Sequence, residues 1–304
     1  MMILHHYELS PFSEKIRLML GYCGLEWTSV ISPAMPPRAI VDPLAGGYRR
    51  IPVVQVGSDI FCDTKLIGAE LASMCNKPEL SMETCGSEIR EYSHYVDTEI
   101  FFAGIQSAHP LTMLLTVFKL FSPIQALRFI KDRTAVQKTS SLQKLSRKNA
   151  LTMLDEHFKL MESKLEQQTF LFGDTPSIAD FSAHHNLWFK YATSGNKRLD
   201  GYTNINRWFQ TMSSFGHGKR IDGGQADAFS EAKNAQPREI SDEMRNAQHI
   251  GERVEIRPAD YAKNAVSGVL VGDNESRWIL LRNTNEFGDI HVHFPKQGFE
   301  LCVL

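Results

Sequence analysis

Ser10-Pro11-Phe12-Ser13 is the stretch of this chain that decides its fold. It follows a short apolar segment, Ile3–Tyr7, whose composition is typical of a strand. It opens the amphipathic segment 11–23, which is typical of a helix and is followed by Gly24 as a C-cap. Taken alone, Ser10 is an N-cap with Pro11 at the first helical position, and this is the commoner meaning of such a pair.

The first 75 residues alternate between strand and helix signals around that stretch. A second strand is predicted at Trp27–Ile31, a loop with a short helix at 33–48, a hairpin at Pro52–Val56 and Ile60–Cys62 around Gly57-Ser58, and a helix at Thr64–Met74. This order is β-α-β followed by β-β-α. Thioredoxin-like proteins place sulfur chemistry at the first helix start, and those that exchange disulfides carry Cys-x-x-Cys there. Both positions are serine here, so a dithiol cycle is excluded, while binding of another molecule's thiol is not.

The rest of the chain divides into a helical and a β-rich part. From about residue 84 to 215 the apolar spacing predicts helices, one starting at Ser177-Ile178-Ala179-Asp180 and one at Thr203–Met212. The character changes at Gly216-His217-Gly218, and residues 222–248 are polar and partly helical. Short strands are predicted at 254–256, 266–271, 278–281, 290–294 and 299–303. We therefore expect a thioredoxin-like domain at 1–75, an all-helical domain at 84–215, and a linker helix with a small β barrel or sheet at 216–304.

The composition of the chain limits the classes of function that it can have. The 304 residues are 42% hydrophobic and 22% charged, as in an ordinary globular protein, and a net charge of −2 gives no support for nucleic-acid binding. The longest apolar run, Leu111 to Phe121, is too short to span a bilayer, and no secretory signal is recognisable. Five scattered cysteines, an odd number, predict free thiols in a reducing compartment. We expect a cytoplasmic protein without a membrane segment.

Two further short motifs lie where a thiol ligand would need them. Pro52 precedes the third predicted strand, and a cis bond from Ile51 would expose backbone groups to an extended peptide; the alternative is an ordinary trans proline at an edge strand. Asp63-Thr64 begins a helix whose N–H groups suit a carboxylate, while Asp63 suits an ammonium group. The alternative is that one of them only caps the helix.

In their joint order, Ser10-Pro11-Phe12-Ser13, Ile51-Pro52-Val53, Asp63-Thr64 and Ser177-Ile178-Ala179-Asp180 resemble the glutathione transferase superfamily over residues 1 to about 215. The resemblance implies a thioredoxin-like domain, a helical domain, a glutathione site, and a homodimer. It implies that glutathione is a co-substrate and that no metal is needed. The extension beyond 216 is not part of the family's usual pattern.

The resemblance assigns roles to particular residues. Ser10 corresponds to the family's catalytic serine or cysteine, and Ser10 and Phe12 would both bind glutathione. The backbone of Ile51 would bind the cysteinyl part of glutathione, with Pro52 as the cis proline, and Asp63 and Thr64 would hold the γ-glutamyl end. A free thiol with a pKa near 8.5 is roughly a tenth thiolate or less at neutral pH. A hydroxyl donor and a helix N-terminus lower such a pKa.

Several assignments stay open at this point. Tyr7 and Ser13 are alternatives to Ser10, because another branch of the family places a tyrosine at the end of this strand. The cation for the glycyl carboxylate is Arg38, Arg49 or Arg50. His291 and His293 share one strand face and would begin a metal site. No third ligand is apparent, so we expect a solvated face without metal.

The sequence thus predicts a serine-type glutathione transferase of the detoxifying kind, which activates the glutathione thiol for attack on a small electrophile. The alternative is a non-catalytic glutathione-binding or scaffold protein that acts through its C-terminal β region, because a fold does not fix a function.

Overall fold

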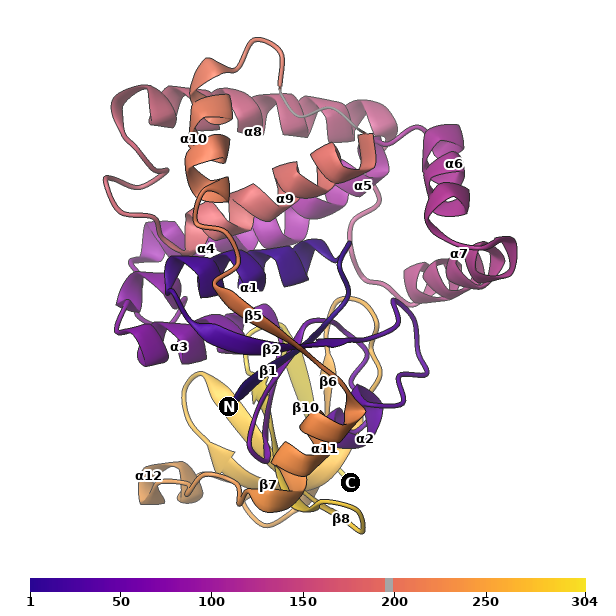
Figure 1. The fold of residues 1–304 in the computed structure, drawn as a ribbon, viewed down its shortest axis with the longest axis vertical. Helices are drawn as coiled ribbons and strands as arrows, with labels where there is room; N and C mark the ends of the chain where they lie inside the picture. Colours follow the sequence, from indigo (N-terminus) through magenta and orange to yellow (C-terminus); the bar gives the residue numbers. More distant parts are fainter. Residues whose placement is uncertain (195–198) are drawn as a thin grey trace.

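One sheet of ten strands runs through the molecule in the computed structural model, which describes residues 1–194 and 199–304 (Figure 1). The strand order is β10-β6-β7-β8-β9-β4-β3-β1-β2-β5. Chain order and spatial order therefore differ, and the first and last thirds of the chain share the sheet. The strands are β1 Met2–His6, β2 Glu26–Ile31, β3 Val53–Val56, β4 Asp59–Cys62, β5 Lys219–Gly223, β6 Arg253–Pro258, β7 Val266–Asp273, β8 Arg277–Thr284, β9 Gly288–Pro295 and β10 Phe299–Val303.

The N-terminal part has the predicted thioredoxin-like arrangement. Strand β1 pairs in parallel with β2 and antiparallel with β3, and β3 forms a hairpin with β4. The helices are α1 Pro11–Tyr22, α2 Val41–Ala45 and α3 Thr64–Cys75. Ser10 and Asp63 are the N-caps of α1 and α3, and each side chain accepts a backbone N–H of its helix. The expected fold class is confirmed here.

The helical part covers the α1 and α3 side of the sheet (Figure 1). It contains a 3₁₀ turn Pro78–Leu80, α4 Ser87–Tyr95, a π-helical turn Val96–Ile100, α5 Phe101–Ser107, α6 Pro110–Leu120, α7 Pro123–Lys138, α8 Arg147–Gln167, α9 Ile178–Ser194 and α10 Thr203–Ser213. The predicted start of α9 is observed: Asp180 accepts hydrogen bonds from the backbone and hydroxyl of Ser177 and from the indole of Trp208. This buried carboxylate joins α9 to α10.

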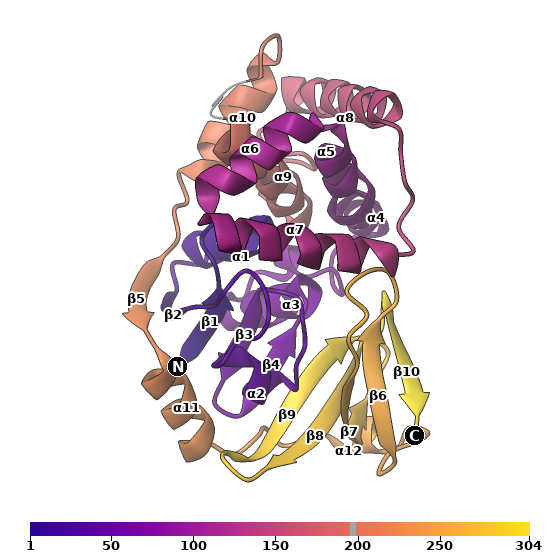
Figure 2. The same ribbon diagram turned by 90° about the vertical axis from the view of Figure 1, so that its right-hand side faces the viewer.

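The C-terminal extension does not form the separate sheet or barrel expected from its sequence. Strand β5 adds to β2 at one edge of the sheet and β9 adds to β4 at the other, both in parallel (Figure 2). Helices α11 Gln225–Asn234 and α12 Asp242–Arg245 connect β5 to the last five strands, of which β6 to β9 pair in chain order and β10 pairs with β6. The reason is that both edge strands of the thioredoxin-like sheet offer unpaired backbone groups, which the extension satisfies.

A close backbone approach lets the chain return from α10 to the sheet. Gly216 lies against Gly21 of α1, where an added Cβ would be 2.0 Å from the Gly216 carbonyl oxygen. Gly216 and Gly218 both have positive φ, 62° and 67°. Glycine is therefore required at this crossing for steric and for conformational reasons.

Two cores lie on opposite faces of the sheet. Alternate residues of the N-terminal strands enter each core: Leu4 and Phe61 pack with α1, α3 and the helical part, whereas Ile3, Val53 and Ile60 pack with α2, α11 and the extension. The side chains of Phe294 and Phe299 from the extension contact the ring of Tyr48. The extension thus completes the second core of the thioredoxin-like region.

The expectation of free thiols is wrong for two of the five cysteines. Cys23 and Cys75 form a disulfide between the end of α1 and the end of α3, whereas Cys62, Cys85 and Cys302 are free.

Among the described residues, no single helix has the length and apolar character of a membrane span. The bent pair Ser87–Ser107 and Pro110–Leu120, at 96°, meets that criterion by length and composition only.

Candidate active site

Three of the sequence motifs meet at one end of the N-terminal sheet. His5 of β1 is opposite Val53 of β3, and Val53 is opposite Cys62 of β4. The residues just beyond these positions are therefore neighbours: Tyr7 to Ser10 after β1, Ile51-Pro52 before β3, and Asp63-Thr64 after β4. Segments about 50 residues apart in the chain thus form one site, with the N-termini of α1 and α3 beside it.

Ser10 has the geometry of a helix cap with a free donor. Its Oγ accepts the Ser13 N–H at 3.2 Å, and its own N–H donates to the Tyr7 carbonyl at 3.1 Å. The hydroxyl hydrogen therefore remains able to donate to a ligand. Ser10 is 1% exposed, so its side chain is enclosed by the surrounding residues.

The neighbouring candidates differ from Ser10 in their surroundings. Ser13 is fully buried in the first turn of α1, and its Oγ has no hydrogen-bond partner among the described residues. Phe12 turns toward the helical part, where its ring contacts Phe101 and His185, each at 4.8 Å between centroids. Tyr7 is half-buried at the end of β1. The geometry places all three around the α1 N-terminus.

The second and third motifs have unusual backbone conformations. The Ile51-Pro52 peptide bond is cis, as the resemblance implied. Asp63 has φ 75° and ψ 141°, a region that disfavours any side chain, and its carboxylate accepts the Lys65 N–H at 3.0 Å. Thr64 follows as the first residue of α3 and is buried. Backbone strain at non-glycine residues is concentrated at functional sites, which makes Asp63 a candidate functional residue by its geometry.

Arg50 links this end of the sheet to the C-terminal extension. Its guanidinium lies 3.8 Å from the Asp63 carboxylate, pairs with Asp260, and donates to the Tyr261 carbonyl at 2.6 Å. The Tyr261 ring covers it at 4.0 Å. Burial opposes the charge, but the facing Tyr261, Tyr48 and acidic groups raise the pKa of Arg50. The loop between β6 and β7 is therefore part of the wall of the candidate site.

The same loop touches the helical part. Ser141, which follows α7, donates its backbone N–H to the Asp260 carbonyl at 2.8 Å, and the Tyr261 ring contacts Phe102 at 5.2 Å. In Figure 2 the end of β6 rises toward α7. Residues 259–262 thus connect the extension, the helical part and the Asp63 end of the site.

The other two arginine candidates have structural partners. Arg38 is 3% exposed, and its side chain donates to the carbonyls of Pro33 and Arg49. Arg49 pairs with Asp132 of α7 at 2.5 Å. Of the three, Arg50 is the one that reaches Asp63.

Buried ion pairs hold α1 in place behind the site. Lys15 donates to Asp97 at 2.7 Å and to Ser182 at 2.8 Å, which ties α1 to the π-helical turn and α9. On the opposite side Glu14 accepts from Arg17 at 2.8 Å and contacts His217 at 3.0 Å. Burial would raise the pKa of Glu14, but His217 and Arg17 hold it below its usual value. Removing either partner of such a pair leaves a buried charge, so the α1 N-terminus is firmly positioned.

This arrangement is suited to holding a thiolate. The α1 N-terminus supplies a positive dipole end and a hydroxyl donor in a water-poor environment, and each favours the charged form of a sulfur ligand. The α3 N-terminus with Asp63 offers both signs of charge to an amino-acid group. A γ-glutamyl peptide with a central cysteine has both features.

Comparisons with known proteins agree with this geometry. Residues 4–78 match the profile of "Glutathione S-transferase, N-terminal domain", and residues 121–215 match "Glutathione S-transferase, C-terminal domain". A solved GST-like protein from Pseudomonas syringae is 32% identical, with 99% of this chain and 100% of that chain aligned and a TM-score of 0.78. The chain belongs to the glutathione S-transferase superfamily, and its extension is present in that relative too.

More distant solved structures align over less of the chain. A glutathione S-transferase from Rhodospirillum rubrum F11 is 15% identical over 70% of this chain and 88% of its own, with a TM-score of 0.48. FzlA from C. crescentus is 19% identical, with 78% of this chain and 93% of that chain aligned and a TM-score of 0.47. A search of curated proteins returned no match.

Sequence reasoning missed the contribution of Asp260 and Tyr261 to this site. They lie about 200 residues after Asp63 in the chain, in a loop with no motif of its own. The signal available in the sequence was Arg50, a charged residue directly before Ile51-Pro52 that needs an acidic partner.

Proposed function

We propose that this protein is a glutathione transferase of serine type, in which Ser10 stabilises the glutathione thiolate for attack on a small electrophile. The backbone of Ile51 beside Pro52 would align the cysteinyl part, and Asp63 and Thr64 would hold the γ-glutamyl end. Detoxification of such electrophiles is the role that we infer. Carbon–sulfur bond formation would displace a leaving group or add across an activated double bond, with no redox change.

The observation that carries this proposal is the meeting of Ser10, Ile51-Pro52 and Asp63-Thr64 at one end of the sheet. The strained backbone of Asp63 supports it independently. Because the chain belongs to the glutathione S-transferase superfamily, glutathione is the first thiol to test.

Calorimetric titration with reduced glutathione tests the site. We expect binding in the micromolar-to-millimolar range, weakened at least about tenfold by Asp63→Asn, since a hydrogen bond to a charged group is worth about 1.5–3 kcal/mol. Asparagine is chosen because it tolerates positive φ better than most residues and still caps α3. Thr64→Ala is expected to weaken binding in the same direction.

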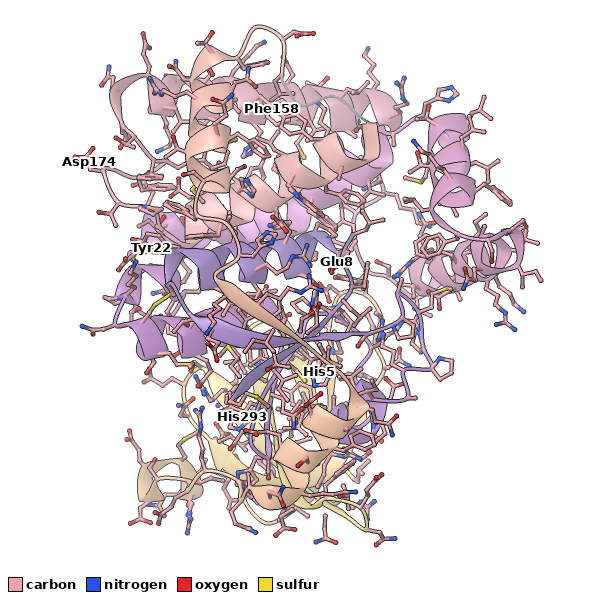
Figure 3. All side chains as sticks on the ribbon, viewed as in Figure 1. His5, Glu8, Tyr22, Phe158, Asp174 and His293 are labelled. Carbon is pink, nitrogen blue, oxygen red and sulfur yellow. A yellow bond between two sulfur atoms is a disulfide. The ribbon has the colours of Figure 1, made fainter. Side chains whose placement is uncertain are left out.

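Asp174→Ala is the matched control, because Asp174 is an exposed carboxylate on the far side of the helical part (Figure 3). This variant should bind glutathione like the wild type. Equal affinity of Asp63→Asn and wild type would contradict the assignment of Asp63. No heat from any variant at millimolar glutathione would contradict the proposed function itself.

We infer that the protein forms a homodimer. The support is an exposed apolar face on α6 and α7, which includes Leu111, Leu115, Ile124 and Leu127. Large exposed apolar patches are typical of association sites. Sedimentation velocity should give twice the chain mass of 34.4 kDa at micromolar concentration. A single species with the mass of one chain would contradict this inference.

The cytoplasm remains the location that we propose, on the superfamily's ordinary character and the three free cysteines.

A non-catalytic glutathione-binding or scaffold protein is the second candidate. The observation that favours it is the β6–β7 loop, whose Asp260 and Tyr261 lie against Arg50 beside Asp63. Glutathione binding without conjugation of any electrophile would support this candidate over the first.

A further inference from the structure

A cluster of two histidines and an aspartate lies where the extension joins the thioredoxin-like strands. Asp59 begins β4, and His291 and His293 belong to β9, which pairs in parallel with β4. Asp59 is opposite His291, and Phe61 is opposite His293. Side chains two residues apart on a strand share a face. All of these side chains therefore lie on one face of the β4–β9 pair, in the extension half of the molecule where Figure 3 labels His293.

This face is not the solvated strand face that the sequence predicted. His293 is 4% exposed and Asp59 is 1% exposed, while the His291 side chain is 12% exposed. The expectation failed because Asp59, the missing third residue, comes from a strand more than 230 residues earlier in the chain.

The distances within the cluster suit a small cation. Asp59 Oδ1 is 2.8 Å from His293 Nε2 and 3.8 Å from His291 Nδ1, and one potential ligand atom from each residue lies within 4.8 Å of the others. In a tetrahedral zinc site with bonds of about 2.0–2.2 Å, neighbouring ligand atoms are about 3.3 Å apart. The two distances from Asp59 Oδ1 each differ from that spacing by about 0.5 Å.

His291 has an unsatisfied atom at this position. Its Nδ1 is buried and has no hydrogen-bond partner in the described part of the chain. Leaving a buried polar atom unpaired costs about 1–3 kcal/mol. A bound cation would remove that cost, whereas a hydrogen bond between Asp59 and His293 alone leaves it in place.

The surroundings orient the potential ligands. Asp59 Oδ2 accepts the Arg238 N–H at 2.9 Å, which fixes the carboxylate and leaves Oδ1 directed at the histidines. The Phe61 ring stacks on His293 at 4.4 Å. Outer contacts of this kind hold ligands in metal sites.

The nearby positive charges are compensated, and the cluster has a route to solvent. Arg238 and Arg277 both pair with Glu70, at 2.7 and 3.1 Å, so neither depends on Asp59 for a countercharge. His291 also lines an open pocket of about 460 Å³, together with Asp289, Arg238 and Arg245. A ligand in this pocket would lie beside the cluster.

We propose that Asp59, His291 and His293 form a binding site for one divalent transition-metal ion, with zinc as the best fit. Two imidazoles and one carboxylate are a ligand set that such ions take, and three protein ligands leave a position for water or a pocket ligand. The site is separate from the candidate glutathione site and does not depend on its function.

Cobalt titration of the tag-free, chelator-treated full-length protein tests the proposal, because Co²⁺ reports its coordination by visible absorption. We expect about one equivalent of Co²⁺ to bind with nitrogen–oxygen bands, and zinc to displace it. His291→Ala should lower the affinity at least about 100-fold, since even outer-contact changes cost about 10–100-fold. This variant keeps the Asp59–His293 and Asp59–Arg238 bonds and is therefore expected to fold.

His249→Asn is the matched control, because His249 belongs to the extension, pairs with the exposed Glu252, and has a positive φ that asparagine accepts. It should bind cobalt like the wild type. Added zinc should raise the Tm of the wild type, because an ion that binds only the folded state stabilises it. Absence of stoichiometric cobalt, equal affinity in His291→Ala, a sulfur-type charge-transfer band, or an unchanged Tm would each overturn the proposal.

Discussion

Ser10→Ala is expected to lower kcat for conjugation of glutathione to chlorodinitrobenzene by about 100-fold, because one preorganised donor to a developing or full anion is worth about that much. Glutathione affinity should change little, since Asp63, Thr64 and the Ile51 backbone hold most of the ligand. The apparent pKa in the pH profile of kcat/KM should rise by about one unit or more, because loss of the donor destabilises the thiolate relative to the thiol. At high pH the two proteins should therefore become more alike.

Two controls separate Ser10 from its neighbours. Ser13→Ala and Tyr7→Phe remove the other hydroxyls near the α1 N-terminus and should keep kcat and the pH profile close to wild type. The loss of the Ser10 cap itself costs about 1 kcal/mol of stability, so a thermal melt must show that the variant is folded at the assay temperature. If Ser10→Ala kept the full kcat while Ser13→Ala or Tyr7→Phe lost it, the thiolate-stabilising role would belong to Ser13 or Tyr7 instead.

The N-terminal region could be read from the sequence because its signals are local. Ser10 and Asp63 are capping residues immediately before amphipathic helices, and Gly57-Ser58 marks a two-residue turn, so element boundaries followed from neighbours in the chain. The order of these elements then placed three motifs at one end of the sheet. The roles of the individual residues came from the resemblance to the superfamily and not from these local signals.

The place of the extension could not be read in that way. The strands β6 to β10 were predicted as strands, whereas β5 was missed in a segment expected to be a linker. Nothing local in β5 or β9 specifies that one pairs with β2 and the other with β4. The pairing of two edge strands depends on the sequences of both strands. Each strand alone shows only the alternating pattern that any strand shows. The contacts Arg50–Asp260 and Asp59–His293 were missed for the same reason.

The largest expected effect on stability comes from ending the chain at residue 220. The deletion uncovers one face of the thioredoxin-like sheet. Ile60, Val53 and Tyr48 would lose the cover supplied by residues such as Phe294 and Val292. Each apolar side chain is worth about 1.5–3 kcal/mol when buried.

Polar groups would be exposed or orphaned as well. Gln55 donates to the Ala228 carbonyl at 2.8 Å, Ser58 donates to the Ala235 carbonyl at 2.8 Å, and Asp59 loses Arg238 and His293. Losing cover from even four apolar side chains approaches the whole stability of a domain, about 5–15 kcal/mol. We therefore expect the 1–220 fragment to be insoluble or to lack a cooperative thermal transition, as measured by near-ultraviolet circular dichroism and calorimetry.

A point variant on the solvent side of the extension provides the comparison. Glu300 pairs with Arg257 across the exposed β10–β6 edge, and such surface pairs are worth about 1 kcal/mol or less. Glu300→Ala should therefore melt within a few degrees of wild type. A soluble 1–220 fragment with a sharp melt would contradict the shared core and make the extension a separable unit. If the fragment fails as expected, loss of activity on truncation says nothing about function, and the role of the extension must be tested through single residues such as His291.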